Sequence, residues 1–469
     1  MTILLTIAAY FGLLLLVSRL TGRGGDEAFF RGERKSPWPV VAFGMVGASL
    51  SGVTFISVPG MVTGIDMTYL QMCMGFIVGY ALVAFLLLPL YYRHGLTSIY
   101  GYLGLRFGRV SHRTGAWFFI VSKLTGAAAR LYLVCLILQR YALPGLPYWA
   151  VVVGTLALIW LYTRRSGVGA LVWTDALQTL CLIGALVGIL VKTMQLLDMD
   201  LGEAWTAVAT SSHSRVFEWT DWGSTQHFWK QFVSGVFIVV VMTGLDQDMM
   251  QKNLTCRSPR AGQKDLCSYG LLFLPVNALF LALGVLLLLL YGKEGLAVPE
   301  GGDQLLPGLV ATGRMGQGVL VMFTIGIIAS AFSSADSALT ALTTSVCVDI
   351  LGDERPRRKV HVGLAAVFVL CVLAFKMIGS QSVIDAIYTL ASYTYGPLLG
   401  LFAFGMLTRR KPREGGVPLV ALLAPLLCWA ADSVAQRCWG YRFGYELLLL
   451  NGALSFAGLW LLSVGRRSR

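Results

Sequence analysis

Apolar stretches of about 20 residues recur along the whole chain, and a helix needs about that length to cross a hydrocarbon core of about 30 Å. Charged residues make up 13% of the chain and hydrophobic residues 56%, whereas a soluble domain carries about 25% charged residues. The sequence therefore predicts an all-α integral membrane protein with about thirteen transmembrane helices, over 3–20, 40–58, 69–91, 116–140, 147–163, 168–192, 228–246, 268–291, 318–348, 359–377, 383–407, 416–433 and 445–464.

The positive charges are unevenly distributed between the two sides that these spans define. With alternate connecting segments assigned to opposite sides, 26 of the 37 Lys and Arg residues fall on one side. Cytoplasmic loops carry the excess of Lys and Arg in membrane proteins. We therefore expect the N-terminus outside, the C-terminus in the cytoplasm, and a cell membrane location, the inner membrane of a bacterium. This pattern accounts for the net charge of +13 without a nucleic-acid partner, and the lipid bilayer is the expected surrounding.

The first apolar stretch lacks a basic n-region and a small-residue cleavage site, so it is predicted to be a retained helix rather than a signal peptide. The longest segment between spans is about 193–227, so no soluble domain is expected. The nine cysteines include no C-x-x-C pair, and the five histidines lie in loops or at span ends. Neither pattern indicates a metal site or a catalytic set. We therefore expect that the protein is not an enzyme and that it has no cofactor.

Two spans are interrupted in comparable ways near the starts of two five-helix blocks. The second contains "GMVGASLSGVTFISVPG" (residues 44–60), and the seventh contains "VMTGLDQDMM" (residues 241–250). Glycine weakens a helix by about 1 kcal/mol relative to alanine. Broken helices at matching positions of two halves indicate a transporter whose ligands bind at mid-membrane. Close packing of helices through small residues is the alternative.

The ninth span carries a stripe of hydroxyl side chains. Ser330, Ser333, Ser334 and Ser337 stand at positions i, i+3, i+4 and i+7, and therefore share one helix face. Hydroxyl oxygens offer lone pairs, and hard cations prefer oxygen ligands. The stripe predicts one wall of a sodium site beside Asp336. The alternative is that the hydroxyls bond back to their own helix or join helices together.

Three ionisable residues are predicted to lie inside spans, where each costs about 2.5–3.5 kcal/mol on insertion scales and by default indicates function. They are Asp175, Asp336 and Arg130. An arginine at that depth needs an anion, either a protein carboxylate or a solute carboxylate. For Asp175 the structural alternative is a helix-end cap or a partner for Arg164 or Arg165.

Five motifs in this order resemble the sodium:solute symporter family, whose members have the LeuT-type fold of two inverted five-helix repeats. They are "SGVTFISVPG", "VWTDALQ", "LDQDMMQKNLT", "SSADSALTALTTSVCVDI" and "YTYGPLLGLF". The resemblance implies a single transporter domain over 1–469. It divides into an extra N-terminal helix and loop (1–39), two five-helix repeats (40–192 and 228–407) and two peripheral C-terminal helices (408–469).

The resemblance also implies which residues bind sodium and solute. A principal sodium site is implied at Gly47, Leu50, Ser330, Ser333 and Ser334. A second sodium site is implied at Asp175, Asp336 and Ser337. Solute contacts are implied at Ser51, Thr54, Gln71 and Arg130.

The activity implied is uptake of a small polar solute driven by inward sodium flux, through alternating access. Arg130 favours an organic anion such as sialic acid or another carboxylate-bearing sugar. A monocarboxylate, an amino acid or a neutral sugar is the next alternative, and a membrane solute sensor of the same fold is a further one. Sodium is the only coupling ion expected, and one chain is expected to be the functional unit.

Overall fold

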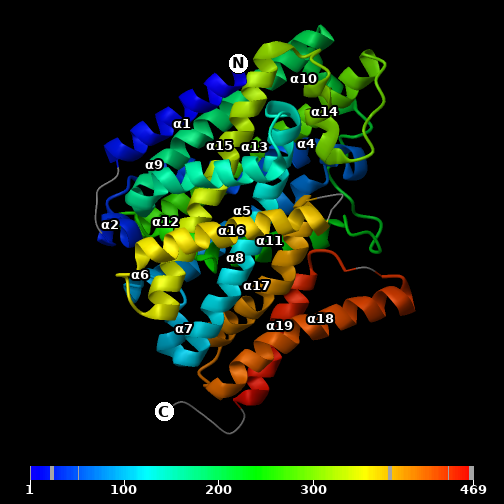
Figure 1. Cartoon of the computed structure of the whole chain (residues 1–469). Helices are drawn as coiled ribbons and strands as arrows, with labels where there is room; N and C mark the ends of the chain where they lie inside the picture. The colour runs from blue at the N-terminus through cyan, green and yellow to red at the C-terminus, as the bar shows by residue number, and fades with distance from the viewer. Residues whose placement is uncertain (1, 22–25, 51, 379–382, 442, 464–469) are drawn as a thin grey trace.

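The computed structural model describes residues 2–21, 26–50, 52–378, 383–441 and 443–463, and these form a bundle of helices (Figure 1). Within these ranges the only β-pairing is an isolated bridge between Ser36 and Cys256. The first half of the chain contains α1 (Thr2–Thr21), α2 (Asp26–Arg31), α3 (Trp38–Ser49), α4 (Gly52–Ile65), α5 (Tyr69–Leu82), α6 (Leu88–Arg93), α7 (Gly101–Arg106), α8 (Arg109–Ile137), α9 (Tyr148–Leu197) and α10 (Leu201–Thr210).

The second half of the chain is also helical. It contains α11 (Phe228–Val239), α12 (Gln247–Asn253), α13 (Pro259–Lys293), α14 (Leu305–Ala311), α15 (Gly316–Ser345), α16 (Arg357–Ile378), α17 (Val383–Leu407), α18 (Val417–Trp439) and α19 (Leu447–Leu462). Single turns of wider π-helix extend four of these helices, over Val83–Leu87, Leu138–Ala142, Val240–Gly244 and Val346–Leu351. Short 3-10 turns cover Gly32–Arg34, Gly302–Gln304 and Glu414–Gly416.

The prediction of an all-helical membrane protein is confirmed in the described part of the chain. Eight helices are long and apolar enough to cross a membrane, and the number rises to ten if each of two bent pairs is one span. Three shorter apolar helices cover Leu5–Thr21, Tyr148–Arg164 and Leu447–Leu462. The exact count of thirteen spans, and the assignment of the first and last helices as extra ones, stay predictions.

Both predicted breaks are present. The axes of α3 and α4 differ by 61° and those of the α11 and α12 segments by 71°. At the first break Leu50 leaves the helical conformation with φ −77° and ψ 77°. At the second, Asp246 caps α12, because its carboxylate accepts hydrogen bonds from the backbone N–H groups of Asp248 and Met249. Each break leaves backbone groups without their partners inside the helix.

A third interruption divides α9, whose 50 residues are more than one span requires. Gly167 has φ 57° and ψ −169° inside this helix, with the shorter apolar segment Tyr148–Arg164 before it and the span-length segment Gly167–Leu197 after it. A Cβ atom at Gly167 would lie 2.1 Å from the Cα atom of Phe29. Glycine is required there, both for the left-handed φ and for the close approach of the chain before α3.

The helices that flank the core lie at opposite edges of the bundle (Figure 1). On one edge α1 packs against α9 and α15, and on the other α18 and α19 pack against α17. The short helices α10 and α14 lie at one end of the bundle, and α6 and α7 lie at the other. This separation agrees with the sides predicted for these connecting segments, while the direction of insertion stays a prediction.

Candidate ion and solute site

The first break lies where α3, α9 and α15 meet. The backbone N–H of Gly47 donates a hydrogen bond to the Thr179 hydroxyl at 3.1 Å. A Cβ atom at position 47 would lie 2.1 Å from that same oxygen, so α3 packs with its backbone directly on α9. The Thr179 hydroxyl in turn donates to the backbone carbonyl of Asp175 at 2.8 Å. The close approach brings the last carbonyl groups of α3 next to the acid-bearing turn of α9.

The predicted serine stripe of α15 is buried and faces this junction. Ser330 bonds back to the carbonyl groups of Gly326 and Ile327 at 2.8 and 2.9 Å, as the packing alternative supposed. Ser333 instead donates to Asp175 Oδ1 at 2.8 Å. The Ser334 hydroxyl is buried and has no hydrogen-bond partner among the described residues. A hydroxyl that donates its hydrogen keeps two lone pairs, so all three oxygens retain capacity for a cation.

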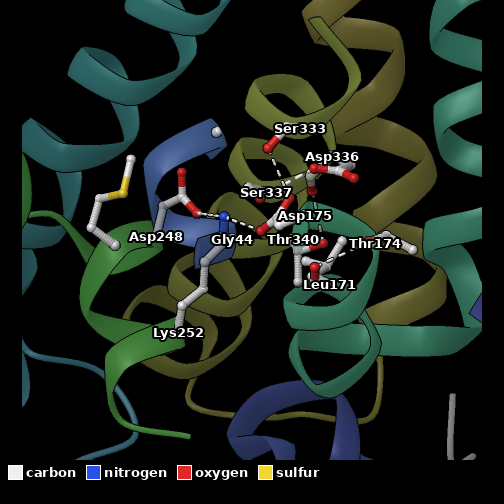
Figure 2. Close-up of polar contacts among 12 residues, drawn as sticks. Gly44, Leu171, Thr174, Asp175, Asp248, Lys252, Ser333, Asp336, Ser337 and Thr340 are labelled. Atoms are coloured by element: carbon white, nitrogen blue, oxygen red, sulfur yellow. Dashed lines mark hydrogen bonds and ion pairs between the residues drawn. The ribbon is translucent and has the colours of Figure 1, made fainter. Parts of the chain in front are cut away.

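Asp175 is paired with a lysine that the sequence analysis did not assign. Its Oδ2 atom lies 2.7 Å from Nζ of Lys252, and the two side chains are 1% and 2% exposed. The alternative partner Arg164 lies elsewhere, with its guanidinium 4.9 Å from the ring centre of Trp160. Figure 2 shows the Lys252 ammonium group between the carboxylates of Asp175 and Asp248.

The ion pair belongs to a buried network that reaches α8 and α17. Nζ of Lys123 lies 2.6 Å from Asp248 Oδ2 and 3.2 Å from Asp246 Oδ2. The Tyr395 hydroxyl donates to Asp246 Oδ2 at 2.6 Å. The network therefore joins α12, which follows the second break, to the helices on both sides. A signal was present in the sequence, because "LDQDMMQKN" places three charges in a short segment that had to be buried.

Asp336, the acid of the serine helix, has partners of its own. Its Oδ2 atom accepts a hydrogen bond from the Tyr162 hydroxyl at 2.5 Å, and its Oδ1 atom accepts one from Ser337 at 3.1 Å. Thr340 donates to the backbone carbonyl of the same residue. The side chains of Asp336 and Asp175 point toward the same region between α9 and α15 (Figure 2).

The residues implied for the solute do not all lie together. Ser51 lies outside the described residues, and Thr54 is buried in α4 with 7% of its surface exposed. The Gln71 amide donates to the backbone carbonyl of Gln226 at 2.9 Å and accepts from the N–H of Glu218 at 3.0 Å. Gln71 thus ties α5 to the segment before α11.

Arg130 lines a small cavity of about 30 Å³ at the second break. Lys123, Met242, Asp246 and Tyr395 contribute to the same wall. Arg130 is half-buried, and it makes no hydrogen bond or ion pair with any residue that the structure describes. The alternative of a direct internal ion pair is therefore absent from the described part of the chain.

A second cavity of about 710 Å³ lies beside α4, α17 and the segment before α19. Ser57, Tyr69 and Tyr393 contribute to its wall. Among its described lining residues are the carboxylates of Glu300 and Asp303 and of Asp432, and none of the described ones is Lys, Arg or His. Cavities of this size hold drug-sized molecules.

Two bent spans in a bundle of apolar helices, with polar groups gathered at both breaks, are typical of membrane transporters of the LeuT type. A solved structure confirms the fold: a substrate-bound, outward-open Na+-coupled sialic acid symporter matches with a TM-score of 0.83 at 20% identity, over 100% of this chain and 99% of the other. Residues 29–418 match the sodium:solute symporter family. The chain belongs to that family.

Curated relatives differ in what they carry. The human sodium/iodide cotransporter is 28% identical over 423 residues, which cover 84% of this chain. The sodium/sialic acid symporter NanT of Aliivibrio fischeri is 25% identical over 469 residues, which cover 96% of this chain and 92% of NanT. This chain spans only 65% of the length of the human relative.

Proposed function

We propose that the protein is a secondary active transporter of the cell membrane, which couples inward sodium flux to uptake of a small organic anion. The observation that carries the proposal is Arg130, a half-buried cationic side chain that lines a cavity at a broken span and makes no hydrogen bond or ion pair with a described residue, although its charge acts on the Asp248 carboxylate. A guanidinium in that position binds a carboxylate through two parallel hydrogen bonds. Sialic acid or another carboxylate-bearing sugar is the first candidate solute.

The proposed sodium site consists of the carbonyl groups of Gly47 and Leu50 and the hydroxyl groups of Ser330, Ser333 and Ser334. It is supported by the contact of α3 with α9 at Gly47 and by the hydrogen bond from Ser333 to Asp175. Sodium entering the cell would supply about 2.3 kcal/mol per charge for each 100 mV of membrane potential. One chain contains both sites, so one chain would be the functional unit.

The cavity around Arg130, about 30 Å³, is far smaller than the roughly 300–1,000 Å³ of pockets that bind drug-sized ligands. A sugar acid therefore requires a more open arrangement of the same bundle. Such an opening is what alternating access provides, since the two halves rock around a fixed site. The two bends, 61° and 71°, mark the segments whose inner and outer halves would move separately.

A neutral or amine-bearing solute, such as a sugar or an amino acid, is the second candidate. The larger cavity favours it, because its described lining residues include three carboxylates and no cation. Carboxylates would repel an anion that approaches through this cavity. A monocarboxylate has the same charge as the sugar acid and is separated from it only by size.

Uptake into proteoliposomes tests the proposal. Purified protein would be supplied with labelled sialic acid, lactate, alanine and glucose in turn, with sodium or with choline outside. We expect uptake of an acid that depends on sodium. Arg130→Gln should reduce acid uptake at least tenfold, whereas Arg140→Gln, at an exposed arginine near the end of the same helix, should not.

Each arm of the experiment decides a separate part of the proposal. Acid uptake that is equal in sodium and in choline contradicts sodium coupling. Sodium-driven uptake of glucose or alanine, unaffected by Arg130→Gln, would assign the solute to the second candidate.

A further inference from the structure

The ammonium group of Lys252 lies against the carboxylate of Asp175, the acid of the second sodium site that the resemblance implies. Its Nζ atom lies 2.7 Å from Asp175 Oδ2, with both side chains almost fully buried. Lys252 belongs to α12 and Asp175 to α9, so the pair joins a broken span to a continuous helix. The ammonium group is therefore a cation held at this acid by the chain itself (Figure 2).

The charge of Lys252 is committed to Asp175 rather than shared equally with its own helix. Asp248 lies 3.8 Å from Lys252, and it has a nearer cation in Lys123 at 2.6 Å. Lys123, which also lies 3.2 Å from Asp246, is thus the nearer cation of Asp248. Lys252 lies nearer to Asp175 than to Asp248 and is the cation in contact with Asp175.

The remaining oxygen of Asp175 is also occupied. Oδ1 accepts the hydrogen bond from Ser333 at 2.8 Å. The Gln178 amide nitrogen donates to the same oxygen at 3.1 Å in the amide orientation that satisfies both of its polar atoms. No oxygen of this carboxylate is free of a partner.

A second sodium ion on Asp175 would have to lie next to the ammonium group. Hard cations bind carboxylate oxygens at about 2.3–2.6 Å, and the ammonium already lies 2.7 Å from Oδ2. Repulsion between two unit charges about 4 Å apart, at an effective dielectric constant of about 20, weakens binding roughly a thousandfold.

We propose that Lys252 acts as the built-in cation of the Asp175 site, so that the protein binds one sodium ion per chain, and that a neutral residue at position 252 creates a second sodium site. The inference deepens the proposed function and rests on it. Asp336 and Ser337, which lie beside this acid, would then serve the added ion only in the variant.

Equilibrium binding of ²²Na+ tests the inference without any solute. The full-length protein in lipid nanodiscs would be titrated with sodium against a choline background. We expect one ion per wild-type chain with a Hill coefficient near one, and two ions per chain for Lys252→Met. Adding Asp175→Asn to Lys252→Met should return the count to one.

Two further variants separate the position of the charge from its mere presence. Lys252→Arg keeps a cation at Asp175 and should keep one ion per chain. Lys293→Met removes an ammonium group from an exposed pair with Asp198, and it should leave the count unchanged. Lys252→Gln is measured as a second neutral variant, so that the test can still be made if Lys252→Met does not fold.

The outcomes separate this inference from the function beneath it. No saturable sodium binding to the wild type contradicts the proposed function itself. Two ions per wild-type chain overturn the inference and leave sodium coupling intact. One ion per chain in both Lys252→Met and Lys252→Gln also overturns the inference. Two ions per chain in Lys252→Arg would overturn it as well, because that variant keeps a cation at Asp175.

Discussion

The contact between Gly47 and Thr179 predicts that even a methyl group at position 47 damages the sodium site. In Gly47→Ala the new Cβ atom would lie 2.1 Å from the Thr179 hydroxyl oxygen and 3.0 Å from Cα of the same residue. Ordinary contacts begin at 3.4 Å, so α3 would have to move away from α9 by about 1.3 Å.

The expected loss can be estimated from the contacts. Overpacking of this kind costs about 1–3 kcal/mol, and loss of the Gly47 hydrogen bond to Thr179 costs about 1 kcal/mol. The higher helix propensity of alanine offsets about 1 kcal/mol of this. We therefore expect the free energy of unfolding to fall by about 1–3 kcal/mol. The same displacement moves the Gly47 carbonyl away from the ion, and each 1.4 kcal/mol of lost binding is tenfold in affinity.

The assay is sodium titration and thermal unfolding of the purified protein, both followed by tryptophan fluorescence. Gly47→Ala should raise the sodium concentration at half-saturation about tenfold or more. Gly184→Ala lies on the same part of α9 as Thr179 but has no atom within 4 Å of the new Cβ position, so it should leave the sodium curve unchanged and should not lower the stability, which the helix propensity of alanine can raise by about 1 kcal/mol. Thr179→Ala, added to Gly47→Ala, removes the shortest contact and should restore part of the stability. A wild-type sodium curve in Gly47→Ala would refute the packing argument.

Three other perturbations have expected outcomes. Tyr162→Phe removes the hydroxyl that donates to Asp336 at 2.5 Å, and the free energy of unfolding should fall by about 1.5–3 kcal/mol. An unchanged free energy of unfolding would mean that another group donates to this carboxylate. Lys123→Met removes the ammonium group nearest to the buried carboxylates of Asp246 and Asp248 and should cost about 3–5 kcal/mol in the same assay, far more than Lys293→Met, whose pair is exposed. Hydrogen bonds from the hydroxyl and then the backbone of Thr220 lower the pKa of Glu218 from 4.5 to about 2, so the stability that they add is present above about pH 4.5 and is lost as the pH falls toward 2. Hydrogen exchange of residues 214–226 at pH 6 and pH 3 should show this loss in the wild type and not in Glu218→Gln.

The helical architecture could be predicted from the sequence because membrane helices are specified by length and apolarity alone. The two breaks were also predictable, since glycine, threonine and charged residues interrupt otherwise apolar runs. The sequence predicts a boundary between spans 147–163 and 168–192, and Gly167, whose φ and ψ are not helical, divides α9 at that place. Helix boundaries of this kind depend on tertiary contacts, here with Phe29.

The candidate site was only partly predictable. The serine stripe follows from helical periodicity, and its burial follows from the surrounding apolar residues. Which cation lies against Asp175 could not be predicted, because Lys252 is 77 positions away in the chain and its helix is defined only by the bend after α11. The role of Gln71 likewise depends on a segment outside its own helix.

The account depends most on the sodium site between the first break and the hydroxyl stripe, and one measurement tests it directly. The sodium titration of wild-type protein would be compared with that of the double variant Ser333→Ala/Ser334→Ala, and with Thr324→Ala as a control from the first half of the same helix. The account predicts that the double variant needs at least tenfold more sodium for half-saturation and that the control does not. An unchanged sodium curve in the double variant would contradict it.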